Sequence, residues 1–365
     1  MKILSAQQIL NWDKYTCEEG KIAPIDLMER AAAACVQWLL NKMSPEKKYF
    51  IFCGKGNNGG DGLAIARMLL KADVKVFIYI LETGKLGTAD FQTNLHRLHD
   101  MKAMEFHFIQ YEESLPVIDD DAIIIDALFG SGLARPLQNL AAAIVNHINQ
   151  SRAIVVSIDL PSGLFIDQSS NGSTVIRADH TLTFQCYKLG LLVQENAPFI
   201  GAVNVLDIGL LPRYLDTVIS KQEIIDEWMI RKMFKPRNRF SHKGTFGHAL
   251  LIGGSYGKMG AMVLATKACL HTGAGLTTVF VPRCGYPIMQ ISTPEAMVLT
   301  DEEDNFLSSL PADIEKFNSI GIGPGMDTKE STQKILSFIV RRYQKPLVID
   351  ADGLNCLSLQ KELLN

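Results

Sequence analysis

The chain repeats one local pattern, in which a short apolar segment is followed by a glycine-rich turn and then by a stretch with helical periodicity. Strands that alternate with helices run parallel, so the pattern predicts an α/β fold with helices on both faces of a sheet. Segments 122–126 and 153–159 are apolar without alternation, as expected of strands buried on both sides. Before residue 211 we expect strands at 49–53, 74–80, 122–126, 153–159, 180–184 and 203–207, and helices at 25–41, 60–72, 88–100 and 137–150.

The pattern of strands and glycine-rich turns is interrupted at 211–240, which divides the chain into two parts. This segment contains two prolines and many charged residues, and it predicts an inter-domain connection with a short helix at about 221–234. The strand-and-glycine pattern then restarts, with strands expected at 248–252, 276–281, 318–322 and 346–350. A length of 365 residues also favours two domains. We predict a first domain at 1–215, a linker at 216–240 and a second domain at 241–365.

Composition narrows the class of protein. The net charge of −3 argues against a nucleic-acid-binding protein, and no apolar run approaches the length of a membrane span. Charged residues such as Asp13 and Glu18 occupy the place where a signal peptide needs an apolar stretch, which argues against export. The seven cysteines are scattered without a CxxC pair, so we expect neither a disulfide framework nor structural zinc, and we expect a cytoplasmic protein.

Three of the expected strands end in glycine-bearing turns that also carry a carboxylate, at 54–62, 126–136 and 159–164. In an open parallel sheet, ligands bind beyond these carboxyl ends. The first turn contains the GxGxxG spacing of a dinucleotide site, and Glu82 follows the next strand as that pattern requires. Asp61 at the start of the following helix argues against a plain phosphate cradle, because its carboxylate competes for the positive helix end.

Side chains in these turns suggest specific chemistry. Asn58, Asp126 and Ser162 offer hard oxygen donors, which suit a group I or II cation rather than zinc. The glycines of 130–136 free backbone N–H groups for an anion. Asp159 lies between a buried strand and a Pro-Ser-Gly turn, where partial desolvation fits it for proton transfer.

Two basic residues belong to the same analysis. Arg135 can supply charge to a phosphate, and Lys188 could reach the same edge of the sheet. The alternative is that the Asp and Asn residues cap helices and stabilise turns, while Arg135 and Lys188 are solvated. None of the histidines has the spacing of a metal site.

The loops GKGNNGGDGLAIAR, DALFGSGLARP and IDLPSGL resemble the signature loops of NAD(P)H-hydrate epimerases. This resemblance covers roughly residues 1–215 and implies a Rossmann-like three-layer αβα domain. The second block is similar to the ADP/ATP-dependent NAD(P)H-hydrate dehydratases, which have a ribokinase-like fold. Bacterial members fuse the two, with the epimerase first. The stretches that carry the second resemblance are SHKGTFGHALLIGGS, MGAMVLATKACLHTGAGLTTV, TPEAM, GIGPGM and VIDADGLN.

The epimerase resemblance implies a substrate, a cation and a catalytic residue. The substrate is NADH or NADPH to which water has added at C6 of the nicotinamide ring, and the reaction interconverts the R and S forms. Asn58, Asp126 and Ser162 would hold a potassium ion, and Asp159 would bind the ring and take part in catalysis. The residues implied to contact the hydrated dinucleotide are Asn57, Asn58, Gly59, Gly60, Asp61, Gly130, Ser131, Gly132, Leu133, Ala134, Arg135, Pro136 and Asp159.

The second block departs from its family. Members continue to a histidine-containing TPHPGE-like loop and to a GGxGD-like turn that carries the catalytic aspartate, and neither is found among residues 241–365. Ala261 and Gly323 would remain of the hydrate pocket, whereas Asp350 and Asp352 do not match the catalytic position. We therefore expect an incomplete ribokinase-like domain, no binding of ADP or ATP with Mg²⁺, and no dehydratase activity.

An open sheet edge and an uncovered apolar face would follow from an incomplete second domain. Such a domain would pack on the first domain, dimerise or tend to unfold, and we expect a homo-oligomer. Nothing identifies a reader of the 2′-phosphate, so NADH hydrate and NADPH hydrate stay equally open. Two other functions also stay open, namely a nicotinamide-dependent dehydrogenase and a non-catalytic dinucleotide-binding module.

Overall fold

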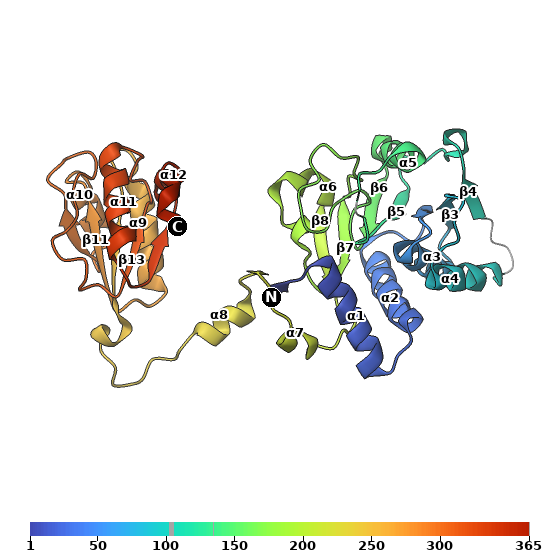
Figure 1. Cartoon of the computed structure of the whole chain (residues 1–365), viewed down its shortest axis with the longest axis horizontal. Helices are drawn as coiled ribbons and strands as arrows, with labels where there is room; N and C mark the ends of the chain where they lie inside the picture. The colour runs from blue at the N-terminus through green and yellow to red at the C-terminus, as the bar shows by residue number, and fades with distance from the viewer. Residues whose placement is uncertain (102–105, 134, 365) are drawn as a thin grey trace. The chain divides into compact units, whose positions relative to one another are not determined.

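The structure, a computed structural model, describes residues 1–101, 106–133 and 135–364. It forms two compact units, Met1–Phe234 and Lys235–Asn365 (Figure 1). The boundary falls inside the segment 216–240 that the sequence marks as a connection, while the bounds 1–215 and 241–365 stay a prediction. In the described part of the chain, no helix combines the length and the apolarity that crossing a bilayer requires.

The first unit is built on a seven-stranded parallel sheet of order β4-β3-β2-β5-β6-β7-β8. All six strands expected here are present, within one or two residues at their ends. The seventh, β4, was not predicted, because its FHFI sequence has two exposed central residues and lacks an apolar run. The strands are β2 (Tyr49–Cys53), β3 (Val76–Leu81), β4 (Phe106–Ile109), β5 (Ile123–Ala127), β6 (Ile154–Ile158), β7 (His180–Phe184) and β8 (Ala202–Leu206).

Helices cover both faces of this sheet, which makes three layers (Figure 1). Successive side chains of a strand point to opposite faces, so Ile51 packs with the helices of one layer and Phe52 with the other. The layer on the Ile51 side contains α2 (Pro24–Lys42), α3 (Asn57–Lys71) and α4 (Ala89–His99), and the other contains α5 (Asn139–Gln150).

Helix α3 begins at Asn57 and not at residue 60, so the prediction placed its start too late. Glycine lowers helix propensity, which hid the first turn from a sequence reading. The structure requires glycine here: a Cβ atom at Gly59 would lie 1.7 Å from the carbonyl oxygen of Gly54. The first turn of α3 is therefore packed directly on the loop that precedes it.

The N-terminus is tied to the end of the first unit. Strand β1 (Lys2–Ile3) pairs antiparallel with β9 (Gln222–Glu223). The helix predicted at 221–234 is consequently shorter, because its first residues form β9, and only α8 (Glu227–Met233) is helical. The other helices of this unit are α1 (Ala6–Gly20), α6 (Ala197–Ile200) and α7 (Tyr214–Thr217).

The second unit is also a parallel three-layer structure, with the strand order β12-β11-β10-β13-β14. The four expected strands are present, and β12 is an additional edge strand whose residues are mostly exposed. Its strands are β10 (His248–Ile252), β11 (Leu276–Val281), β12 (Met297–Thr300), β13 (Ser319–Ile322) and β14 (Leu347–Ile349). One face carries α9 (Met259–His271) and α10 (Gly285–Ser292), and the other carries α11 (Glu330–Arg342) and α12 (Asp352–Ser358).

Each sheet has one point at which the strand order reverses. In the first unit it lies between β2 and β5, and in the second between β10 and β13. Loops that leave the carboxyl ends of two such strands diverge to opposite faces and leave a crevice for a ligand. These two edges are therefore the places to look for function.

Candidate functional site

The three glycine-bearing loops of the first unit meet at its switch point. The Asn58 side chain donates from Nδ2 to the Ile158 carbonyl oxygen at 2.9 Å, which links the first loop to the third. Ser162 Oγ donates to Asp126 Oδ1 at 2.5 Å and accepts from Phe129 N at 2.9 Å, which links the third to the second. A Cβ atom at Gly130 would lie 2.9 Å from Asn58 Nδ2, so the second loop also rests on the first. The structure thus brings Asn58, Asp126 and Ser162 together.

Asp126 is a fully buried carboxylate at the centre of this arrangement. It accepts hydrogen bonds from Ser157 Oγ, from the backbone N–H and Oγ of Ser162, and from Leu128 N. Burial raises the pKa of Asp126, against the opposing effect of these hydrogen bonds. Among the described residues it forms no ion pair with a basic side chain.

The Asn58 amide oxygen is also buried, and it has no hydrogen-bond partner in the part of the chain that the structure describes. Buried polar atoms are nearly always paired, and a cation held by the three loops would give this oxygen a partner. The donor set of amide, carboxylate and hydroxyl oxygens fits a hard cation such as potassium. It does not resemble a transition-metal centre, since no group of three His, Cys, Asp or Glu side chains suited to a metal occurs among the described residues.

Asp159 and Lys188 form an ion pair beside these loops. Asp159 has a left-handed backbone with φ of 65°, a strained conformation that places its side chain directly after β6. Lys188 is 1% exposed, and its Nζ atom donates to Asp159 Oδ1 at 2.7 Å, to Thr183 Oγ1 at 2.7 Å and to the Phe184 carbonyl oxygen at 2.8 Å. The solvated-lysine alternative is therefore wrong for Lys188, because its ammonium group is held by three acceptors.

A cavity of about 580 Å³ opens between α1, α2 and the start of α3. Asn57 and Asp61 line it, together with Asp13 of α1 and Phe184 at the end of β7. Asp61 is 9% exposed, and no hydrogen bond to its carboxylate occurs among the described residues. Burial raises its pKa well above the usual range, and the neighbouring charge of Asp159 adds to this effect.

Asp13 was not recognised as a site residue from the sequence, where it counted only as a charge in the N-terminal segment. Burial and the charge of Asp159 raise its pKa to about 6, while Lys188 opposes the shift. Only the fold could reveal this residue, because α1 is distant in sequence from the three signature loops and its carboxylate belongs to no motif.

The remaining predicted contact residues lie in two places. Gly59 and Gly60 are buried in the first turn of α3. The other described residues lie in the loop after β5, where Gly132, Arg135 and Pro136 are exposed and Ser131 and Leu133 are half-buried. Ala134 lies outside the described residues. Arg135 is thus a solvated loop cation in the free chain, and its contact with a phosphate stays a prediction.

Glu82, the acidic residue of the dinucleotide pattern, already has partners. Its Oε1 accepts from Lys55 Nζ at 2.5 Å and from Gly84 N at 2.7 Å. Both bonds lower the pKa of this carboxyl, with the Lys55 bond as the largest cause. The pair joins the first loop to the segment after β3.

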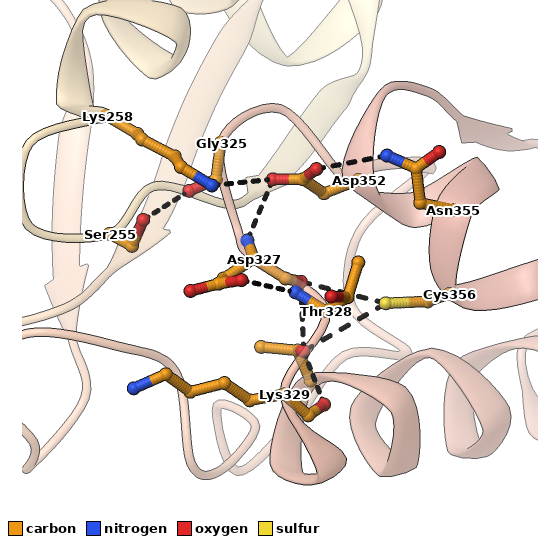
Figure 2. A network of polar contacts seen from close by, with 10 residues as sticks. Ser255, Lys258, Gly325, Asp327, Thr328, Lys329, Asp352, Asn355 and Cys356 are labelled. Atoms are coloured by element: carbon orange, nitrogen blue, oxygen red, sulfur yellow. Dashed lines mark hydrogen bonds and ion pairs between the residues drawn. The ribbon is translucent and has the colours of Figure 1, made fainter.

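The carboxyl edge of the second unit carries a different polar network (Figure 2). Asp352 accepts from Asp327 N at 2.9 Å and from Asn355 Nδ2 at 3.2 Å, and it lies 3.6 Å from Lys258 Nζ. Burial opposes ionisation of Asp352, but these partners lower its pKa. Ser255 Oγ donates to the Gly325 carbonyl oxygen at 2.8 Å, which joins the loops after β10 and β13.

The two residues expected to remain of a hydrate pocket lie at this same edge. Ala261 is in the first turn of α9, and its Cβ atom would be 3.5 Å from a Cβ atom added at Gly325. Gly323 follows β13, and a Cβ atom there would lie 1.8 Å from the carbonyl oxygen of Asp350. Their role in binding stays a prediction.

Each of the two units contains a segment that matches a known protein family. Residues 24–190 match the family model of the YjeF-related protein N-terminus, and residues 249–365 match that of NAD(P)H-hydrate dehydratase. The bifunctional NAD(P)H-hydrate repair enzyme Nnr of Moorella thermoacetica is 32% identical, over 100% of this chain and 71% of its own length. The chain belongs to the bifunctional NAD(P)H-hydrate repair enzymes. The Escherichia coli member is 31% identical over 92% of this chain and 63% of its own length.

Two solved structures are similar to parts of the chain. A yeast protein, ynu0, is 20% identical and covers 66% of this chain and 97% of its own, with a TM-score of 0.47. The ADP/ATP-dependent NAD(P)H-hydrate dehydratase of Bacillus subtilis, crystallised with ATP and Mg²⁺, is 29% identical over 35% of this chain and 46% of its own, with a TM-score of 0.30. The match of residues 249–365 to the dehydratase family rests on the family model, and the incompleteness of that domain stays a prediction.

Proposed function

We propose that the first unit is an NAD(P)H-hydrate epimerase, which interconverts the R and S forms of hydrated NADH or NADPH at C6 of the nicotinamide ring. The observation that carries this proposal is the Asp159–Lys188 ion pair at the meeting point of three glycine-bearing loops. A pyrophosphate held by such loops would fix the ring relative to the carboxylate, and fixed geometry is itself a large part of catalysis.

The chemistry requires one proton to be given and one to be taken. The C6 hydroxyl is attached beside a ring nitrogen whose lone pair can expel it, so the C6–O bond breaks when an acid protonates the departing oxygen. Water then adds to the other face of C6 and gives its proton to a base. Asp159 is the residue that we assign to proton transfer at the ring, and Lys188 holds its carboxylate in place.

Asn58, Asp126 and Ser162 would hold a potassium ion in this proposal. The supporting observations are the buried carboxylate without a basic partner and the unpaired amide oxygen of Asn58 on a loop linked to it. When bound, the ion supplies positive charge that offsets the Asp126 carboxylate and holds the three loops in register. The residues of this chain carry out the proton transfer.

Asn57, Asp61 and the 130–136 loop would contact the substrate. Asn57 and Asp61 line the cavity beside Phe184, where the ring would lie. The loop after β5 and the first turn of α3 would hold the pyrophosphate, because their backbone N–H groups lie at the switch point.

For the second unit we propose that residues 249–365 contribute part of a hydrate-binding surface through Ala261 and Gly323 but drive no nucleotide-dependent dehydration by themselves. The support is the sequence of residues 235–365, in which no segment resembles the TPHPGE-like loop or the GGxGD-like turn. Recovery of NADH absorbance from the S hydrate with ATP or ADP and Mg²⁺, above a control without protein, would overturn this proposal.

The epimerase proposal is tested by adding the 365-residue protein to NADH hydrate enriched in one epimer, in potassium buffer. Proton NMR should show the C6 signals relaxing to the equilibrium mixture faster than in the protein-free control. Tight binding without faster interconversion would favour the non-catalytic binding module. A steady change at 340 nm with NAD and simple alcohols or acids would favour the dehydrogenase.

A further inference from the structure

The cavity of the first unit contains a carboxyl group, Asp13, for which the reaction as described has no role. Asp13 lies on α1 and lines the cavity together with Asp61 of α3. Asp61 is 9% exposed and faces the same cavity as Asp13. A molecule that occupies this cavity would therefore meet two carboxyl groups.

The charges around Asp13 do not balance. Asp13 and Asp61 line the same cavity, while the buried ammonium group of Lys188 is already paired with Asp159. The other titratable residues that line the cavity are Lys14, Cys17 and Glu18 of α1 and Asp90 of α4, and the lining residues of α2 are apolar. Burial and Asp159 raise the pKa of Asp13 to about 6. The cavity therefore retains a carboxyl proton at a pH at which an exposed aspartate has lost it.

Epimerisation has a stereochemical requirement that such a group can meet. The hydroxyl leaves one face of C6 and water returns to the opposite face, so a proton donor and a proton acceptor are needed at two positions. Asp13 of α1 and Phe184 at the end of β7 both line the cavity. Asp159 follows β6, and the Lys188 ammonium group that holds it also donates to the carbonyl oxygen of Phe184, which links Asp159 to the cavity wall.

We propose that Asp13 is the second proton-exchanging residue of the epimerase and works with Asp159; this inference rests on the proposed epimerase function. In one direction Asp13 gives its proton to the C6 hydroxyl, the C6–O bond breaks, and water leaves as the N1 lone pair forms the N1–C6 double bond. Water then adds to the other face, its proton goes to the Asp159 carboxylate, and N1 regains its lone pair. The reverse reaction exchanges the two roles, and exchange with solvent returns the proton to Asp13.

The test compares Asp13→Asn, Asp13→Glu and Glu19→Gln in the full chain. Glu19 is an exposed carboxylate at the end of the same helix and does not line the cavity, so its variant is the matched control. Rates of epimerisation are followed by NMR from about pH 5 to pH 8 in both directions. The wild-type kcat should fall as pH rises through about 6, because Asp13 loses its proton there.

Asp13→Asn should lower kcat about 100-fold, leave KM unchanged and remove this pH dependence. Asp13→Glu should keep a pH dependence, with a midpoint that moves with the pKa of the new carboxyl, and Glu19→Gln should behave as the wild type. Thermal unfolding adds an independent readout. The pKa of Asp13 is raised on folding, so its ionised form destabilises the fold above about pH 6, and Asp13→Asn should raise Tm near pH 8 by about 2 °C or more. A residue with a purely structural role would lower Tm when replaced.

Wild-type kcat and pH dependence in Asp13→Asn would overturn the inference and leave the epimerase proposal intact. Should that variant fail to fold, Asp13→Glu decides: a pH dependence that moves with the new carboxyl supports the role, and an unmoved one overturns it. A wild-type protein without epimerase activity would overturn the proposed function, and this inference with it.

Discussion

The two units place a polar site at the same topological point but build it from groups of very different burial. At the first edge, Asp126 is fully buried and Lys188 is 1% exposed. At the second edge, the side chains of Lys258 and Asp352 are 50% and 21% exposed. Burying charged groups costs free energy, so a fold keeps them where they do something. The proposed chemistry therefore agrees with the buried groups of the first edge, whereas the charged groups of the second edge are more exposed and pair with one another.

The comparison is tested most strongly by Asp159→Asn. If the first edge carries the chemistry, this substitution should reduce the rate of epimerisation by about 10²–10⁴-fold, because it removes a proton-transfer group. Affinity for the hydrate, measured by isothermal titration, should change little, since the loops that hold the pyrophosphate are intact. Circular dichroism controls for folding. Turnover equal to that of the wild type would remove Asp159 from the mechanism.

Lys188→Met tests the burial of the ion pair. It leaves the Asp159 carboxylate without its buried partner, and we expect the free energy of unfolding of the first unit to fall by about 3 kcal/mol. All three tryptophans, at positions 12, 38 and 228, belong to the first unit, so tryptophan fluorescence during urea unfolding reports on that unit alone. A decrease in the free energy of unfolding of less than about 1 kcal/mol would mean that this ion pair stabilises the unit no more than an exposed ion pair does.

Potassium should stabilise the first unit, to which the proposed ion site belongs. At an ion concentration of about ten times Kd, binding to the native state adds about 1.4 kcal/mol to the stability of the first unit. Exchange of potassium for a bulky organic cation should therefore lower its Tm and slow epimerisation. Asn58→Ala should lose this response. The same Tm in potassium and in the organic cation would argue against the ion site. So would a change of Tm between the two cations that is as large in Asn58→Ala as in the wild type.

Lys258→Met should have the smallest effect. Its partner Asp352 keeps two other donors, and a pair this exposed contributes less than about 0.5 kcal/mol. The rate of epimerisation should be that of the wild type, and circular dichroism should show nearly unchanged unfolding. A loss as large as that of Lys188→Met would show that the two edges do not differ in the way described.

Strong local patterns made much of this fold predictable. The buried parallel strand β2 was expected at its observed bounds, because a continuous apolar run before a glycine turn has few other interpretations. The edge strands β4 and β12 were missed for the opposite reason, since exposed residues interrupt their pattern.

The residues of the site also divide into those that the sequence predicted and those that it did not. Asn58, Asp126 and Ser162 lie at or after the carboxyl ends of predicted strands, so their convergence could be expected from the parallel sheet alone. The burial of Lys188 and the position of Asp13 at the cavity depend on how the segment after β7 and α1 pack, and no local pattern in the sequence predicts that packing. Residues outside motifs become visible only when the fold is complete.

The most direct test of the account is a crystal structure of the Asp159→Asn variant with hydrated NADH. We expect the dinucleotide along the loops after β2 and β5, with C6 of the nicotinamide within hydrogen-bonding reach of residue 159 and the ring in the cavity lined by Asp13 and Asp61. A dinucleotide bound only at the edge of the second unit, or a ring that lies away from residue 159, would contradict the account.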